Sequence, residues 1–421
     1  MTTVTVAVPR TATILRLLIG RGAFRVGVQV TAVALVTVWD GPAFSLYAGA
    51  VGQCAWLLLA GDAPEKAALK TLPRTRRLGP SVARLSLAMA AVPTLVLLAA
   101  LVPVAVFAPL SAATAYLAAG TWSACTGLLM AVSGLHRLRG RPGLDTVAFG
   151  ATGGVVLAVT AATLLVGWAP QVHLLLLLAG TLVVTAMAVA ALPRDWLRRP
   201  PGAPRRRLLG KLARLTWLLG VADLCDALCF ALVYLVLAVS GLAGQSGTLY
   251  LALLPAVAVC QVVVYLLRVT QPATSHRLRG VQGRSGRSRA RRLLRLGERL
   301  GAGFAAVFAL LLAVPVTRGH LTAGEPSVLA LGPLVGVVLI LFLIVMYAGY
   351  LVENTNNDVL VVTSSGALVG LVATGLLAVA LVPWLGALGA LAALALSIPI
   401  KAHTIRRMMI FRELERTTCT Y

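Results

Sequence analysis

The sequence predicts an all-α polytopic membrane protein with about 12 transmembrane helices in two pseudo-symmetric six-helix bundles. Of its 421 residues, 59% are hydrophobic and 12% are charged, and the mean hydropathy of +0.91 excludes an ordinary soluble domain. The apolar runs are continuous and lack the alternation that a membrane β-barrel requires. A basic linker near the middle of the chain separates two similar series of these runs.

A hydrocarbon core about 30 Å thick needs roughly 20 apolar residues per helix. When charges, Pro and Gly are taken as boundaries, the first half contains six spans, near 14–38, 43–61, 82–108, 111–135, 144–168 and 172–192. The second half contains six more, near 215–240, 248–267, 300–316, 328–352, 359–384 and 386–400.

A polar segment with PPGAP at its centre divides the chain. We expect an N-terminal six-helix bundle, a basic cytoplasmic linker and a C-terminal six-helix bundle with a basic cytoplasmic tail, over residues 1–193, 194–214 and 215–421. The halves resemble each other, because Tyr47 and Tyr250 each follow a helix and a short glycine-containing turn. This order indicates a parallel repeat of the kind that transporters build around a midplane site, although any two membrane hairpins look somewhat alike.

Basic residues fall in alternate connecting segments, as the positive-inside rule requires when both termini are cytoplasmic. About 35 of the 37 Lys and Arg residues lie in inside segments, which leaves Arg25 in a span and Arg318 outside. The Ala-, Leu-, Val- and Arg-rich composition is typical of a GC-rich bacterium, so we expect a plasma-membrane protein. Its basic loops, above all the one from Arg268 to Arg299, would lie on anionic lipids. Nucleic-acid binding is not expected, because the charge is spread over all inside segments.

Away from their ends, the predicted spans hold few ionisable residues: Arg25 in the first, and Asp223 and Asp226 in the seventh. A charge near the middle of a membrane helix costs about 2.5–3.5 kcal/mol, so it is rarely kept without a partner or water. The three residues lie at similar depth in the membrane, and the three-residue spacing between Asp223 and Asp226 puts both carboxylates on one helical face. Two interpretations remain open: a hydrated cavity where Arg25 binds a charged substrate, and a fixed structural ion pair. Asp223 also fits the cytoplasmic interface.

Further polar residues complete the candidate site. Three of them would line the same cavity or make interhelical contacts, namely Gln29, Tyr234 and Gln261. Asp40 follows the first span, where a helix-turn cap is favoured over a gate contact. Glu353 and Asn357 lie in the ENTNND run between the tenth and eleventh spans, which suits a turn or a cytoplasmic gate.

Catalytic and metal-binding motifs are missing from the sequence. The five histidines are scattered singly, without HExxH, GxSxG or a phosphate-cradling loop. Cys225 and Cys229 share a helix face, but a thiol pair without His or acidic ligands fits small-residue packing better than metal binding. We therefore expect neither an enzyme nor a cofactor.

Three segments carry a family resemblance. They are the first hairpin running into GDAPEKAALKTLPR, the restart of the chain at the seventh span, and the ending GALVGLVATGLLAVALVPWLGALGALAALALS. Together they resemble the polysaccharide exporter (Wzx-like) branch of the multidrug/oligosaccharidyl-lipid/polysaccharide (MOP) flippase superfamily. The resemblance covers the whole chain through patterns of spans and turns. It implies two six-helix bundles, alternating access, and movement of a lipid-linked oligosaccharide from the inner to the outer leaflet.

Members of that branch often keep cationic residues in the cavity for the pyrophosphate, and Arg25 is the matching candidate. Asp223 and Asp226 depart from this pattern, since carboxylates do not suit an anionic substrate. The alternative is a proton- or cation-coupled exporter of a small molecule or drug, similar to the MATE family. A membrane glycosyltransferase fits less well, because the outer segments are short. We expect a monomer.

Overall fold

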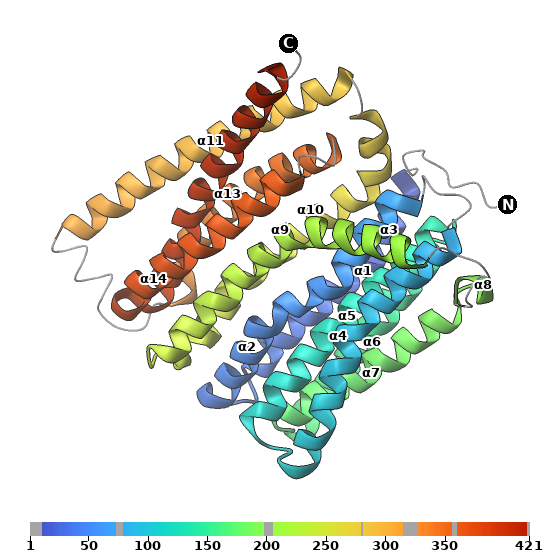
Figure 1. The fold of residues 1–421 in the computed structure, drawn as a ribbon. Helices are drawn as coiled ribbons and strands as arrows, with labels where there is room; N and C mark the ends of the chain where they lie inside the picture. The colour runs from blue at the N-terminus through green and yellow to red at the C-terminus, as the bar shows by residue number, and fades with distance from the viewer. Residues whose placement is uncertain are drawn as a thin grey trace. The chain divides into compact units, whose positions relative to one another are not determined.

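The computed structural model describes residues 11–72, 79–197, 205–278, 281–314, 327–355 and 360–418, and these residues form helices and short turns without a strand (Figure 1). The first helices along the chain are α1 (Thr11–Leu35), α2 (Gly41–Cys54), η1 (Ala55–Leu58), α3 (Leu59–Thr71), α4 (Gly79–Phe107), α5 (Ala112–Leu138), α6 (Gly143–Val166), α7 (Pro170–Ala190) and α8 (Arg194–Leu197). They are followed by α9 (Arg205–Val239), η4 (Ala243–Gln245), α10 (Ser246–Arg277), α11 (Val281–Ala313), α13 (Val328–Thr355) and α14 (Leu360–Thr418).

Eleven helical segments of the described chain are long and apolar enough to cross a membrane. The last of them, Leu360–Arg412, holds two of the predicted spans, because the helix is broken at Gly386 (φ 57°, ψ −131°). Only glycine fits there, since a Cβ would collide with the amide of Gln245, whose Oε1 accepts from the Ala387 N–H at 2.8 Å. The all-α fold class with about 12 spans is confirmed.

Contacts divide the chain into two compact units. Unit 1 comprises Met1–Gly220 and Gln261–Ala273, and unit 2 comprises Val221–Cys260 and Thr274–Tyr421. The predicted bundle boundaries at 193 and 215 remain a prediction. The contacts differ from them in assigning the middle of α10 to unit 1, because Tyr265 and Arg268 on that segment contact buried charges of unit 1.

The centre of unit 1 is α5, which packs against α2, α3, α4, α6 and α7. Its side chains are mostly Ala, Gly, Ser and Thr, and 83% of its most apolar stretch is buried. Gly61 of α3 and Gly127 of α5 bring two backbones into direct contact, which a Cβ on either would prevent. Close approach through small residues therefore holds this unit together, and α4, α5, α6 and α7 run as neighbouring rods (Figure 1).

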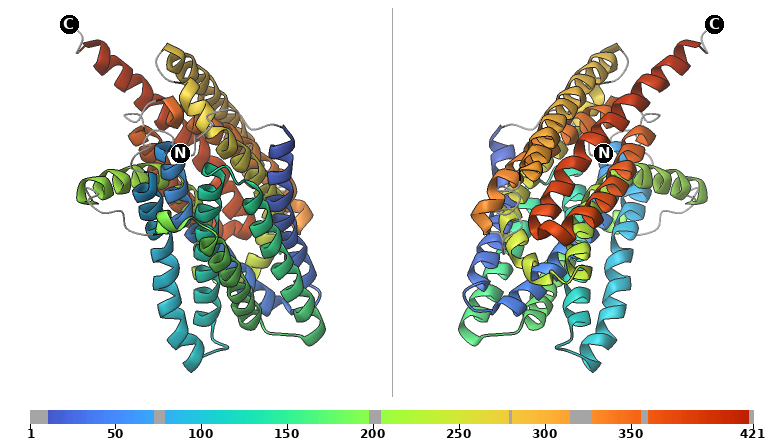
Figure 2. Two further views of the ribbon diagram at one scale, coloured as in Figure 1. Left: turned by 90° about the vertical axis from the view of Figure 1, so that its right-hand side faces the viewer. Right: turned by 90° about the vertical axis from the view of Figure 1, so that its left-hand side faces the viewer.

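Unit 2 is built around α11, α13 and α14, which pack against one another (Figure 2). Leu331, Leu341 and Leu391 belong to its buried apolar side chains. Many large apolar side chains on both units are exposed instead, as along α4, where Val92, Leu95 and Val96 are more than half exposed. Such a surface suits lipid, so the chain is a multi-pass membrane protein.

Candidate functional site

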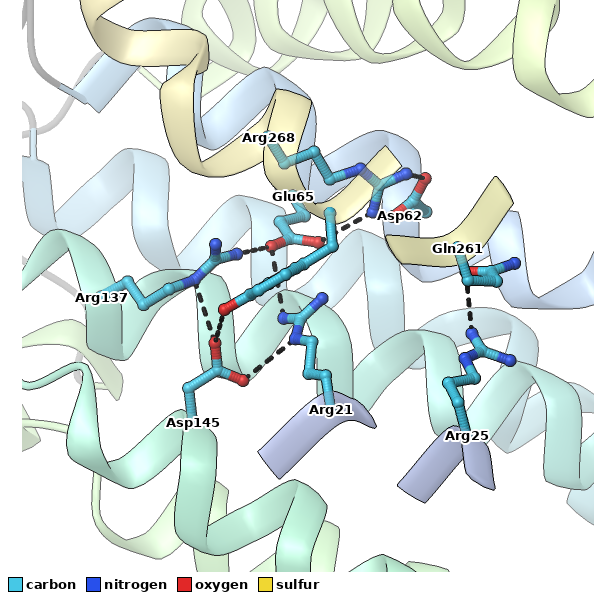
Figure 3. Close-up of polar contacts among 9 residues, drawn as sticks. Arg21, Arg25, Asp62, Glu65, Arg137, Asp145, Gln261 and Arg268 are labelled. Carbon is cyan, nitrogen blue, oxygen red and sulfur yellow. Dashed lines mark hydrogen bonds and ion pairs between the residues drawn. The ribbon is translucent and has the colours of Figure 1, made fainter. Parts of the chain in front are cut away.

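Seven polar side chains from five helices meet in the interior of unit 1. These are Arg21 of α1, Asp62 and Glu65 of α3, Arg137 of α5, Asp145 of α6, and Tyr265 and Arg268 of α10. We call this set the charge network. Figure 3 shows the guanidinium and carboxylate groups pointing toward one another across the helices. Six of the seven residues are buried, and the side chain of the seventh, Arg137, is 10% exposed.

Arg268 is held by both carboxylates of α3. Its two terminal nitrogens donate to the two oxygens of Asp62, and its Nη1 lies 3.5 Å from Glu65 Oε2. The spacing of three residues between Asp62 and Glu65 puts both acids on one face of α3. A fork-to-fork pair of this kind fixes orientation as well as charge, so it ties the middle of α10 to α3.

Asp145, at the start of α6, binds the other arginines. It lies 3.2 Å from Arg21 Nε and 3.3 Å from Arg137 Nε, and it accepts a hydrogen bond from the Tyr265 hydroxyl at 3.3 Å. Arg137 also pairs with Glu65. The guanidinium carbons of Arg21 and Arg137 lie 4.4 and 5.6 Å from the centre of the Tyr265 ring, which adds cation–π contacts.

Three arginines and three carboxylates make the charge network formally neutral. Burying charges in an apolar environment is costly unless each is paired, and here every group has an opposite charge within 4.0 Å. Removing one member leaves its partner uncompensated, so the network is a rigid scaffold for the arginines that it holds.

Arg25 lies one turn beyond Arg21 on α1, at the edge of the charge network. It is half-buried, and its Nη2 donates to Gln261 Oε1 at 3.0 Å (Figure 3). Gln261 lies four residues before Tyr265 on α10, just as Arg25 lies four residues after Arg21 on α1. The pair of Arg25 and Gln261 is therefore one helical turn from the network on both helices. One partner of Arg25 is therefore a neutral amide.

Arg25 and Gln261 line a pocket of about 450 Å³, including space open to solvent. Arg21 and Arg268 also contribute to its wall, together with apolar side chains such as Phe24 and Val262. None of the described residues lining it is acidic, and the three carboxylates of the network are buried. The pocket therefore presents positive charge beside apolar surface, which suits an amphipathic anion.

A different pair occupies unit 2. Lys401 Nζ of α14 lies 2.5 and 2.6 Å from the two carboxylate oxygens of Asp226 on α9. The surrounding pocket, of about 430 Å³, is otherwise mainly apolar, with Phe230 and Phe342 in its wall. Asp223 lies one turn from Asp226 and is half-buried. Within unit 2 the charge of Asp226 is thus balanced by a lysine.

The other predicted residues have separate places. Tyr234 is 3% exposed in the apolar core of unit 2, and Gln29 is half-buried one turn beyond Arg25. Asp40 caps α2 by accepting from the Ala43 N–H at 2.9 Å. Glu353 lies in the last turn of α13, half-buried, and Asn357 is outside the described residues. A pairing of Arg25 with Asp223 or Asp226 stays a prediction.

Sequence reasoning misses most of the charge network. It assigns Arg21, Arg137, Arg268 and Lys401 to the cytoplasmic charges that set the topology, because a buried and a solvated arginine look the same in a sequence. A partial signal is the scarcity of acids: the chain has 13, and those that fall within or beside basic segments include Asp62, Glu65 and Asp145. The described residues contain no group of three or more His, Cys, Asp or Glu side chains that could hold a metal ion.

Solved structures share this fold. An outward-facing multidrug resistance MATE family transporter of the MOP superfamily has a TM-score of 0.58 and 14% identity, covering 95% of this chain and 96% of that one. An inward-facing conformation of such a transporter has a TM-score of 0.53 and 15% identity, covering 96% of each chain. A MOP superfamily transporter from Pyrococcus furiosus, whose binding pocket of reverse polarity suggests a different function, has a TM-score of 0.58 and 14% identity over 98% of each chain.

No protein-family model and no curated protein matches the chain. At these identities the structural likeness establishes the fold alone, which this chain shares with solved structures of MOP superfamily transporters.

Proposed function

We propose that the protein is a membrane transporter that works by alternating access and flips a lipid-linked oligosaccharide or polysaccharide precursor from the inner to the outer leaflet. It would do so in a bacterial plasma membrane, with both termini in the cytoplasm. The general part of this proposal is supported by neighbours of the same fold in inward-facing and outward-facing conformations. Eleven apolar spans agree with it.

The observation that carries the choice of substrate is the pocket of unit 1. Its wall includes Arg21, Arg25 and Arg268, and none of its described lining residues is a carboxylate. Guanidinium groups bind phosphates through two parallel hydrogen bonds, which suits the pyrophosphate of a lipid-linked sugar. The apolar part of the same wall suits the adjoining lipid. Gln261, which accepts from Arg25 in the structure, adds an amide to the same wall.

A proton- or cation-coupled exporter of a small molecule is the second candidate. Two observations favour it: the neighbours include multidrug resistance transporters, and the pocket of unit 2 contains a carboxylate, Asp226. However, Lys401 balances that carboxylate, and a cationic drug would be repelled by the arginines of unit 1.

Transport in vesicles separates the two candidates. The purified protein would be reconstituted with a fluorescent polyprenyl-pyrophosphate-linked sugar, and the fraction reached by an outside lectin would be followed over time. We expect the outside fraction to rise with the protein present and to stay at the protein-free level for a phosphatidylcholine-linked probe. Proton-dependent efflux of an organic cation without exposure of the sugar would contradict the flippase and favour the exporter.

A further inference from the structure

The basic N-terminal part of α11, up to Arg299, carries five exposed arginines on one side of the helix. They are Arg284, Arg289, Arg292, Arg295 and Arg299, and we call them the arginine face. At 100° per residue they span an arc of about 140° around the helix axis. Such clustering does not follow from composition alone, because the same helix also contains Arg287 and Arg291 outside this arc, both only half-exposed.

The opposite side of α11 is packed into unit 2. Ala290 and Leu294 are fully buried in an apolar cluster with Val345 and Ala348 of α13 and Ile405 of α14. These two residues of α11 lie about 150–170° from the centre of the arginine face. Packing therefore fixes the rotation of α11, and the arginine face cannot turn inward without breaking that cluster.

Acidic groups do not neutralise the arginine face. Glu298 is the acid of α11, and its Oε1 accepts from Arg406 Nε of α14 at 2.7 Å. Among the residues that the structure describes, no ion pair involves any of the five exposed arginines. Five positive charges are thus presented together.

Two leucines place the arginine face at a membrane boundary. Leu296 and Leu300 are 45% and 44% exposed. Leu296 lies within the arc of the arginine face, between Arg292 and Arg299 in the sequence, and Leu300 follows Arg299 at the edge of the arc. The helix then runs without interruption into the apolar sequence GAGFAAVFALLLA. Exposed apolar residues beside arginines are typical of a helix at the junction of headgroups and acyl chains.

We propose that the arginine face of α11 binds the phosphates of anionic phospholipids in the leaflet at that end of the helix. Charge complementarity and continuity with a membrane-length apolar segment favour this partner over a nucleic acid or an acidic protein. Arg299, Arg295 and Arg292 lie within about 10 Å of one another along the axis, next to the apolar segment, so they make the main contacts. Arg284, about 22 Å from Arg299, contributes least.

Retention of phosphatidylglycerol tests the proposal without reference to the transported substrate. The protein would be reconstituted in nanodiscs of phosphatidylcholine with a minor share of phosphatidylglycerol, extracted, and analysed by native mass spectrometry for bound lipid. We expect the triple variant R292Q/R295Q/R299Q to retain at least about fivefold less phosphatidylglycerol than wild type. A fivefold loss corresponds to about one surface cation, and the variant lacks three.

Two controls keep the result interpretable. R141Q/K211Q/R214Q removes the same charge from exposed positions elsewhere and should retain lipid like wild type. R284Q should do so nearly as well. Equal retention by wild type and the α11 triple variant, or equal loss in both triple variants, would overturn the proposal, as would preferential capture of RNA by wild type. If the triple variant misfolds, retention by wild type would be measured at increasing salt concentrations instead. Retention that falls with salt would support a charge-driven site, and retention that does not change would overturn the proposal.

Discussion

The two pockets use charge in opposite ways. Unit 1 presents Arg21, Arg25 and Arg268, with three carboxylates placed behind the wall to hold the first and last of them. Unit 2 presents one acid and one base, Asp226 and Lys401, in contact with each other. The lining residues of the first pocket therefore carry a formal charge of +3, and those of the second carry zero.

The difference shows how a membrane protein can keep several charges in an apolar environment. A neutral pair needs only its own partner, as in unit 2. A pocket lined by buried arginines needs acids to fix them, as the charge network does for Arg21 and Arg268. Similar helical halves can thus support different chemistry, and only the first arrangement is suited to hold an anion.

The largest expected effect tests the support of the first pocket. Arg268→Ala would leave Asp62 without the base that it contacts in the structure, and we expect the free energy of unfolding to fall by about 3–5 kcal/mol. Intrinsic fluorescence of the seven tryptophans during heating in detergent would measure the change. Arg277→Ala, which removes an exposed arginine from the same helix, is the matched control. Wild-type melting of the Arg268 variant would mean that the network is not a scaffold.

The second effect concerns Arg25, which lines the same pocket one turn beyond Arg21. Arg25→Gln should slow flipping of the lipid-linked sugar about 10- to 100-fold, because a charge-assisted hydrogen bond worth roughly 1.5–3 kcal/mol is lost. Melting should change less than in the Arg268 variant, since Arg25 is only half-buried. Arg25→Lys keeps the positive charge but lacks the two parallel donors of a guanidinium, so its flipping rate should lie between those of wild type and Arg25→Gln. Full activity of Arg25→Gln would remove this residue from the mechanism.

A smaller effect is expected at Asp40, which belongs to unit 1 but caps α2. Asp40→Ala should cost about 1 kcal/mol of stability through the lost cap and leave the flipping rate unchanged. Asp40→Ser, which can still accept from the Ala43 N–H, should restore the stability. A flipping defect in both variants, with normal melting, would instead support a gate.

The smallest effect is expected where charge is already balanced. Asp226→Asn combined with Lys401→Met removes the pair of unit 2, and the double variant should melt within about 1 kcal/mol of wild type and still flip the sugar. Lys401→Met alone should be less stable than the double variant, since Asp226 then loses its base. Loss of all transport in a stable double variant would favour the coupled exporter and erase the contrast between the pockets.

Much of the fold is accessible from the sequence, because apolar runs of membrane length are long and unambiguous. Even the boundary between the last two spans can be placed, since Pro383 and Gly386 interrupt the apolar run there, and the otherwise continuous helix α14 breaks at that glycine. The sequence also singles out Arg25 and Gln261, and the structure brings the two side chains together.

Partners are harder to predict than positions. The pairing of Arg25 with Asp223 or Asp226 stays a prediction, and the structure adds two partners that the sequence does not indicate, Gln261 for Arg25 and Lys401 for Asp226. Lys401 looks like the start of a tail because it follows the last apolar run, yet α14 continues through it. A charge pattern gives the side of the membrane, but it does not distinguish an arginine in solvent from one turned back into the helices.

Binding of a headgroup to unit 1 is the central claim, and an affinity comparison tests it most directly. Binding of a polyprenyl-pyrophosphate-linked sugar and of a neutral analogue without the phosphates would be measured for wild type and Arg25→Gln in detergent. The charge of the pocket predicts that wild type prefers the pyrophosphate by about tenfold or more and that the variant loses most of this preference. Equal affinity of wild type for both ligands, or a preference for an organic cation, would contradict it.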